Sequence, residues 1–448
     1  MRRGLTGWLA PAAGVLLLLA AGRWIVAGQL GDAAVPHERD AAATPARPDL
    51  AAARRCHAPE PARYARHGAR PTPAGAAARR AAPAAAGEAA RRALPAPAGD
   101  TVGFRETPER TGAAATRGPV GRPAIRWRTT SPAVVFSSPA AAGGLVVVGG
   151  GDGGVHALEA ASGRPVWGFA TGGPVDASPA VAGRTVYSTS ADGNLYALDL
   201  ADGALRWCLA VDAGLSSPAV AGGVVVVSSR GGALYGIAAA SGHLRWQRRV
   251  GASRQASPAV AGGVVYAGGG DGTLHALDLA TGTPRWRFQA DGSIAACPVV
   301  GDGMVYAVDL TGVLHALTAD RGLRRWQRQV GVAGQVLVAS PALARGRLYL
   351  AGDGALLAVD ARSGRTLWRR PGVGAVSSPT VADGTVYVGS ADRYLHAVGA
   401  ADGRPRWRVR LGGGVHSTPA VRAGAVYVGA GAGGLYALGE RPWTSPAG

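Results

Sequence analysis

Four histidines recur at matching positions along the chain and are the first candidates for chemistry. His156, His275, His315 and His396 each follow an apolar residue and precede Ala. Neutral imidazole is a common metal ligand. These four residues belong to different copies of a repeat, however, so their side chains cannot converge on one ion. We therefore predict that they pack between sheets, and that the chain has no metal site.

Other catalytic arrangements are also missing from the sequence. Beyond residue 120 the chain contains two glutamates, Glu159 and Glu440, and one asparagine, Asn194. No P-loop, Ser/His/Asp constellation or metal-ligand spacing occurs. The three cysteines, Cys56, Cys208 and Cys297, do not make up a disulfide framework. These observations favour a protein that is not an enzyme.

Internal repetition indicates which elements carry these residues. Tryptophans recur about every 40 residues, at Trp127, Trp167, Trp207, Trp246, Trp286, Trp326, Trp368 and Trp407. In one copy, the apolar stretches 257–260, 264–268 and 273–278 are separated by Gly-rich turns, and Trp286 opens a fourth stretch. Four short strands joined by tight turns form one antiparallel sheet. The repeat predicts an all-β fold, an eight-bladed β-propeller over residues 121–440, with the tryptophans docked between neighbouring blades.

The two ends of the repeat array predict how the ring closes. Seven of the repeat tryptophans follow a glycine by four positions, whereas Trp127 does not. The last copy has three strand-like stretches and lacks a fourth in the usual frame. Residues 125–128 can supply that strand. We therefore expect an N-terminal strand to pair with the last blade and remove the free sheet edges.

The Gly-x-x-x-Trp turn that follows a Leu-Tyr/His-Ala-Leu-Asp strand resembles the tryptophan-docking motif of quinoprotein alcohol dehydrogenases. In its size and few insertions the chain is most similar to the outer-membrane protein assembly factor B family. That resemblance implies an exported scaffold for other envelope proteins. The dehydrogenases need a quinone, a Ca²⁺ ion, a carboxylate base and an adjacent Cys pair. No two cysteines are adjacent here, so we expect neither PQQ nor calcium.

The first 120 residues differ in composition from the repeats. Arg2 and Arg3 precede an apolar run, which predicts a signal peptide or a signal anchor within residues 1–30. An Ala/Pro/Arg-rich stretch over residues 31–120 predicts a disordered linker, and residues 441–448 form a C-terminal tail. We expect an extracytoplasmic location in the periplasm or at the cell surface, with membrane contact through the N-terminal segment only.

The formal net charge of +19 is spread over both parts of the chain. It fits either attraction to an acidic surface or Arg-rich codon usage on solvated strands. No aromatic-and-basic motif of an RNA-binding module is present, so we expect no nucleic-acid partner.

The loops at one mouth of the channel remain as a candidate binding surface. Residues two positions before each inner-strand Ser or Thr, with their neighbours in the loops, should meet there. The polar candidates are Asp176, Asp212, Arg230, Arg254, Gln255, Asp291 and His416. The sequence favours a monomeric scaffold that binds envelope proteins through this face. A PQQ/calcium-dependent dehydrogenase and a cell-wall polysaccharide-binding module are the alternatives.

Overall fold

The computed structural model describes residues 101–102, 105–129, 137–251, 256–331, 339–352, 354–431 and 434–440. The predictions for residues 1–30, for most of the linker and for the tail at 441–448 lie outside these ranges. Within them the chain forms strands and turns. No helix in this part of the chain is long and apolar enough to cross a membrane.

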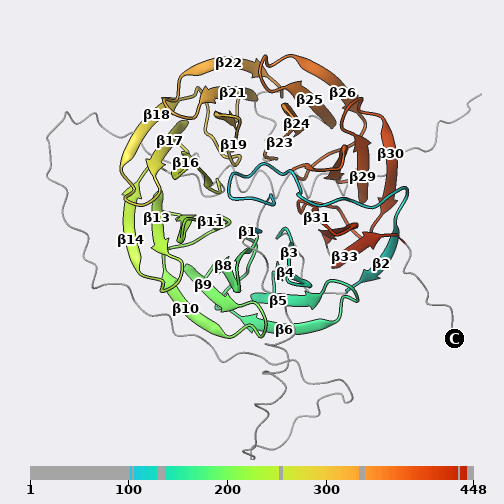
Figure 1. Cartoon of the computed structure of the whole chain (residues 1–448), viewed down its shortest axis with the longest axis horizontal. Helices are drawn as coiled ribbons and strands as arrows, with labels where there is room; N and C mark the ends of the chain where they lie inside the picture. The colour runs from blue at the N-terminus through green and yellow to red at the C-terminus, as the bar shows by residue number, and fades with distance from the viewer. Residues whose placement is uncertain are drawn as a thin grey trace, which may run out of the picture. The chain divides into compact units, whose positions relative to one another are not determined.

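Eight antiparallel sheets surround a central axis, as Figure 1 shows, so the predicted eight-bladed propeller is confirmed. From the axis outward, the first blade contains β3 (Ala140–Ala142), β4 (Leu145–Gly149), β5 (Gly154–Glu159) and β6 (Pro165–Ala170), and the second contains β7 (Ala180–Ala182), β8 (Thr185–Thr189), β9 (Asn194–Asp199) and β10 (Leu205–Ala210). The third blade contains β11 (Ala219–Ala221), β12 (Val224–Ser228), β13 (Ala233–Ala238) and β14 (Leu244–Arg249), and the fourth contains β15 (Ala259–Ala261), β16 (Val264–Gly268), β17 (Thr273–Asp278) and β18 (Pro284–Gln289).

The remaining blades repeat the same order. The fifth blade contains β19 (Val299–Gly301), β20 (Met304–Val308), β21 (Val313–Thr318) and β22 (Arg324–Gln329), and the sixth contains β23 (Ala342–Ala344), β24 (Arg347–Gly352), β25 (Ala355–Asp360) and β26 (Thr366–Pro371). The seventh blade contains β27 (Thr380–Ala382), β28 (Thr385–Gly389), β29 (Tyr394–Gly399) and β30 (Pro405–Arg410), and the eighth contains β31 (Ala420–Arg422), β32 (Ala425–Gly429), β33 (Leu435–Gly439) and β2 (Ala124–Arg128).

The eighth blade takes its outer strand from the N-terminal end of the repeat array. β2 pairs antiparallel with β33, with Trp127 opposite Ala437 and Arg128 opposite Tyr436. The predicted closure by residues 125–128 is therefore confirmed. Because the first and last parts of the array share one sheet, backbone hydrogen bonds join the two ends of the ring.

The core lies between the blades. One apolar cluster combines Val147 and Val155 of the first blade with Val186 and Leu198 of the second. The second and third strands are almost wholly buried because both of their faces meet a neighbouring sheet. Burial on both faces explains why these strands are apolar throughout instead of alternating with polar residues.

Residues 105–120 differ from the disordered linker that the composition predicts. They cross the propeller and pack against the inner strands, as the cyan trace in Figure 1 shows. A short strand, β1 (Thr101–Val102), pairs with β7 just before this segment. Backbone hydrogen bonds to inner-strand edges order the segment, although it offers little apolar surface.

Candidate functional site

The repeat tryptophans join each blade to the next. Seven indole N–H groups donate to a backbone carbonyl of the following blade, in the pairs Trp127–Ala160, Trp167–Leu200, Trp207–Ala239, Trp246–Leu279, Trp286–Ala319, Trp326–Ala361 and Trp368–Ala400. The ring also lies on the glycine of that turn. A Cβ on Gly282, whose φ is +68°, would lie 2.6 Å from Cδ2 of Trp246. The turn therefore needs glycine for its backbone angle and for the indole.

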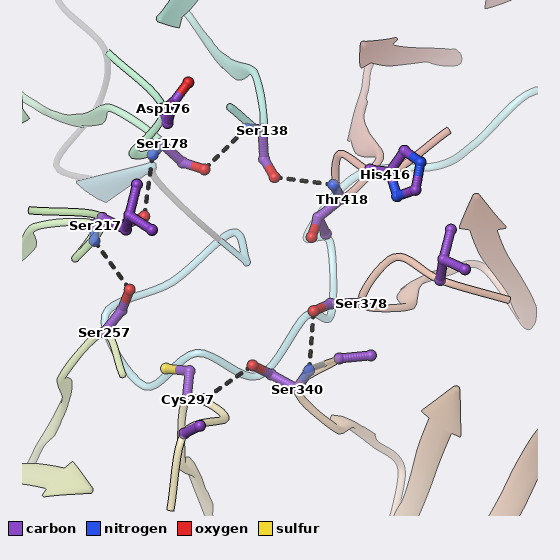
Figure 2. A pocket seen from close by; sticks show the side chains of 14 residues that line it. Ser138, Asp176, Ser178, Ser217, Ser257, Cys297, Ser340, Ser378, His416 and Thr418 are labelled. Carbon is purple, nitrogen blue, oxygen red and sulfur yellow. Dashed lines mark hydrogen bonds between the residues drawn. The ribbon is translucent and has the colours of Figure 1, made fainter. Parts of the chain in front are cut away.

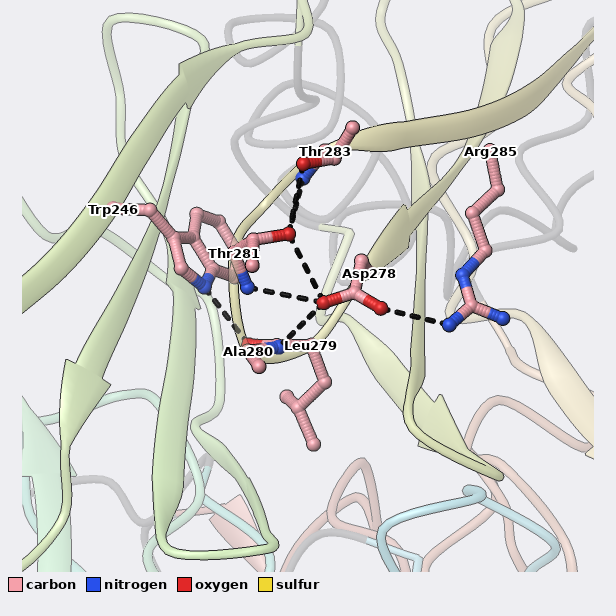
Figure 3. A network of polar contacts seen from close by, with 7 residues as sticks. All are labelled: Trp246, Asp278, Leu279, Ala280, Thr281, Thr283 and Arg285. Carbon is pink, nitrogen blue, oxygen red and sulfur yellow. Dashed lines mark hydrogen bonds and ion pairs between the residues drawn. The ribbon is translucent and has the colours of Figure 1, made fainter.

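An aspartate holds this turn in shape. Oδ1 of Asp278 accepts hydrogen bonds from the backbone N–H groups of Ala280 and Thr281, and Oδ2 accepts one from Arg285 at 2.7 Å, as Figure 3 shows. The bond from Arg285, together with those from the turn, lowers the pKa of Asp278 to about 2. The fixed turn presents the Leu279 carbonyl to Trp246 at 2.8 Å.

Trp407 occupies a different setting, because its neighbour is the blade assembled from both ends of the array. Within the described residues its indole N–H has no hydrogen-bond acceptor. Its ring packs on Tyr387 at 5.7 Å between centroids. The carbonyl of Glu440, at the position of the usual acceptor, instead accepts a hydrogen bond from Arg126 at 2.9 Å.

Two arginines of the N-terminal segment lie inside the central channel. Arg110 donates to the carbonyls of Pro258, Ser217 and Pro218 at 2.8–3.0 Å. Arg105 donates to the carbonyl of Pro341. Both side chains are buried, and burial lowers the pKa of each, that of Arg105 to about 9. Planar guanidinium groups with several donors suit a channel lined by carbonyl oxygens.

The backbone of the same segment satisfies the free edges of the inner strands. The N–H groups of Val260, Val300, Leu343 and Val381 donate to carbonyls of residues 108, 109, 111 and 112 at 2.7–3.1 Å. The corresponding N–H of Val421 donates to the Glu106 carboxylate at 3.1 Å. Each innermost strand would otherwise present an unpaired edge to the channel. The segment therefore closes one end of the channel through contacts with five successive blades.

A ring of small polar residues lines the other end, as Figure 2 shows. Backbone N–H groups donate to the hydroxyl of the next blade at 2.8–3.0 Å in the pairs Ser138–Ser178, Ser178–Ser217, Ser217–Ser257, Cys297–Ser340, Ser340–Ser378 and Thr418–Ser138. Among the described residues, no such bond joins Ser257 to Cys297, whose thiol is a weak acceptor, or Ser378 to Thr418. The sequence shows these residues as the small residue before each inner-strand proline, and only their spatial order reveals the ring.

A cavity of about 190 Å³ lies at this ring. The side chains of Asp176, Leu215, Ala295, Val376 and His416 also line it, and all five stand two positions before a ring residue. Burial raises the pKa of Asp176 and lowers that of His416, so both are shifted towards their neutral forms. Leu215 and Val376 are 44% and 38% exposed. We call the end of the propeller that bears this cavity the loop face.

Of the other polar candidates, those that the structure describes do not line the cavity. Asp212 and Arg230 stabilise loops: Asp212 accepts from the Gly231 N–H at 3.1 Å, and Arg230 donates to the Ala191 carbonyl at 2.6 Å. Asp291 is exposed. Arg254 and Gln255 lie outside the described residues. The structure therefore places Asp176 and His416 at the same cavity, out of the five predicted residues that it describes.

The four histidines at matching positions of the repeat lie in separate blades. Three pair with an aspartate of their own blade, in the pairs His156–Asp152, His315–Asp309 and His396–Asp392 at 2.8–3.2 Å. Burial lowers the pKa of His275. Across the described ranges no three potential ligands are grouped to hold a metal ion.

The residues around the cavity do not fit a Ca²⁺–quinone pair. Ca²⁺ takes six to eight oxygen ligands, carboxylates among them, and Asp176 is the one carboxylate among the described residues that line the cavity. Arg110 already donates to the carbonyls of Ser217, Pro218 and Pro258, at the ring and directly after it. Two guanidinium groups buried next to the ring would also repel a dication.

Sequence reasoning missed Arg105 and Arg110. Their stretch, residues 101–112, contains Thr, Glu, Phe and Gly in place of the alanine runs before it. This change in composition was the available signal that the linker ends before residue 120.

One cysteine also differs from the sequence-based interpretation. Cys297 is free and buried. Cys208 on β10 is disulfide-bonded.

Comparisons with solved structures show the same architecture. BamB from Moraxella catarrhalis aligns with a TM-score of 0.59 and 19% identity, over 72% of this chain and 100% of that one. Quinohemoprotein alcohol dehydrogenase from Comamonas testosteroni aligns with a TM-score of 0.66 and 16% identity, over 81% and 84%. The computationally designed protein Ika8 aligns at 0.61 and 15%, over 72% and 100%. At these identities the likeness shows the fold alone.

No curated protein matches the sequence significantly. The profile of one family, described as outer membrane protein assembly factor BamB, matches residues 122–174, 151–256, 251–375 and 352–444. These overlapping matches cover the whole propeller and well over half of the 448 residues. The chain therefore belongs to the outer membrane protein assembly factor BamB family of PQQ-type propellers.

Proposed function

We propose that this protein is a non-enzymatic scaffold of the cell envelope, which binds a partner protein through the loop face. The proposal rests on two exposed apolar residues at the cavity. Leu215 and Val376 are two of the six exposed large apolar residues in the described part of the chain, and both line a cavity that also has polar walls. Apolar side chains beside Asp176 and His416 match the mixed composition of a protein–protein contact.

The closed channel supports binding at its mouth rather than catalysis within it. Arg105 and Arg110 fill the axis, and the donor set at the ring does not suit a quinone and its calcium ion. The solved structure of BamB supports the non-enzymatic role, whereas that of the alcohol dehydrogenase leaves a redox alternative. In the proposed role the propeller needs no cofactor.

An extracytoplasmic location is part of this proposal. The disulfide at Cys208 supports it, because disulfides persist in oxidising compartments. The apolar run near the N-terminus of the sequence supports export.

Photo-crosslinking tests the proposal. A photoreactive amino acid is placed at position 215 or 376 of the full chain, or at exposed Val166 on β6 as a control. We expect one protein adduct of defined mass from the first two positions and none from position 166. Absence of an adduct at 215 and 376, or the same adduct from all three positions, would contradict a loop-face partner.

A reconstitution experiment tests the redox alternative. The full chain is incubated with PQQ and calcium chloride and then passed through a desalting column. We expect no retained quinone absorbance and no alcohol-dependent dye reduction. Stoichiometric retention with dye reduction would replace the scaffold by a dehydrogenase.

A further inference from the structure

The outer edges of five successive blades carry a dense set of exposed arginines. Strands β14, β18, β22, β26 and β30 contain thirteen arginines and no Asp or Glu. We call these thirteen residues the arginine belt: Arg245, Arg248, Arg249, Arg285, Arg287, Arg324, Arg325, Arg328, Arg369, Arg370, Arg406, Arg408 and Arg410. All of them are exposed.

Almost none of this charge is neutralised within the molecule. In the described ranges Arg285 forms the single ion pair of the belt, with Asp278 at 2.7 Å. Other belt residues bind neutral groups: Arg248 donates to the Gly282 carbonyl, and Arg328 to Thr366 Oγ1. These bonds orient guanidinium groups across the seams between blades and leave their positive charge available to an external anion.

The number of arginines on the outer strand differs from blade to blade, so the Arg-rich composition of the chain does not by itself account for the belt. The equivalent strand of the first blade, β6, has no charged residue, and β10 of the second has Arg206 alone. The outer strand of the eighth blade, β2, has Arg128 and also Arg126, which donates to the Glu440 carbonyl. Arg206 is ion-paired with Asp199 at 2.6 Å. Charged residues can protect an exposed strand edge from pairing with another sheet. However, β6 is an outer edge without them, so edge protection does not require the belt.

The geometry of the belt points to one kind of partner. Its five strands follow one another around the convex circumference of the propeller (Figure 1). A flat bilayer can touch only a sector of a convex rim, whereas a flexible chain can follow all five blades. Single-stranded nucleic acid is usually bound with the help of exposed aromatic rings. The exposed large apolar residues in the described part of the chain include no aromatic one.

We propose that the arginine belt binds a linear polyanion of the acidic polysaccharide class. Carboxylate groups repeated along such a chain pair with guanidinium groups repeated from blade to blade. Binding would release counterions and would weaken as salt concentration rises. This surface is separate from the loop face, so the polysaccharide and a protein partner can bind together.

A charge-matched pair of variants tests the belt. The full chain is titrated with fluorescently labelled alginate, a polyuronate, and with neutral dextran at several salt concentrations. R369Q/R370Q removes two unpaired charges from β26, and R164Q/R206Q removes two ion-paired charges from the first two blades. Both lose the same formal charge, and R369K/R370K keeps it.

The belt predicts an ordered outcome. R369Q/R370Q lowers alginate affinity about tenfold and reduces the slope of log affinity against log salt by about 2. R164Q/R206Q changes the affinity less than about twofold, since its arginines are already neutralised. R369K/R370K stays near wild type, and dextran does not bind. Equal losses in both double glutamine variants would assign the effect to net charge and overturn the belt.

Two further probes separate the other polyanions. The same variants are compared on vesicles that contain an anionic phospholipid and on a single-stranded DNA oligonucleotide. We expect neither probe to distinguish R369Q/R370Q from R164Q/R206Q as strongly as alginate does. A belt-specific loss confined to vesicles or to DNA, or no alginate binding by the wild type, would overturn the polysaccharide assignment.

Discussion

Trp127 belongs to the strand that completes the eighth blade, yet its indole lies against Gly163 of the first blade. A Cβ on Gly163 would lie 2.6 Å from the ring, and the indole N–H donates to the Ala160 carbonyl at 3.0 Å. A single side chain thus connects the blade built from both ends of the array with the blade that follows it. Ring closure depends on this contact as well as on the pairing of β2 with β33.

Trp127→Ala should therefore destabilise the domain more than Trp407→Ala. Trp127 is 9% exposed and hydrogen-bonded, and its removal should cost about 3–5 kcal/mol. Trp407 is less buried, and its indole N–H has no acceptor in the described part of the chain. Thermal unfolding followed by circular dichroism measures both midpoints. Equal midpoints would show that closure does not depend on the Trp127 contact.

Gly163→Ala should cost more than Gly144→Ala, although both glycines lie in turns of the first blade with φ near +70°. An added Cβ on Gly144 meets nothing within 4 Å, so that variant reports the backbone cost alone, about 1 kcal/mol. On Gly163 the methyl group also displaces the Trp127 indole, which raises the cost to about 3 kcal/mol. Denaturant unfolding of the two variants measures the difference. Matching values would mean that the indole moves away freely.

Arg110→Met should release the N-terminal segment from the channel. The substitution leaves the carbonyls of Ser217, Pro218 and Pro258 without their donor in a buried place. Limited trypsin digestion should then cut at Arg105, which is buried in the wild-type protein. Arg117→Met, at an exposed position of the same segment, serves as the control and should leave Arg105 protected. Protection of Arg105 in both variants would contradict anchoring by Arg110.

Docking of the segment should also depend on pH through Glu106. Burial raises the pKa of this carboxyl to about 7, above its value near 4.5 in the unfolded chain. Between these values the folded state binds more protons than the unfolded state, so the group's contribution to stability falls as pH rises from about 4.5 to 7. Thermal midpoints of wild type and Glu106→Gln should diverge over this window in the direction that favours the variant at pH 7. Glu109→Gln is the control, and parallel curves for wild type and Glu106→Gln would refute the coupling.

The sequence alone determined the architecture, because the residues of one repeat are sufficient to specify one blade. Gly-rich turns, apolar strands and a tryptophan at a fixed spacing specify one blade, and blades that cannot bury their faces alone must stack. The missing glycine before Trp127 also predicted the closing strand. The strand that contains Trp127 has no blade of its own and the last blade lacks a fourth strand, so the two were expected to pair, as β2 and β33 do.

The contents of the channel were decided by tertiary structure alone. The serine ring consists of residues about 40 positions apart, and each hydrogen bond in it joins two blades. Arg105 and Arg110 belong to no repeat, and their carbonyl partners lie more than 100 residues away along the chain. Local patterns in a sequence report the strand to which a residue belongs. They do not report which backbone groups remain unpaired at the centre once eight strands converge, and those groups bind the N-terminal segment.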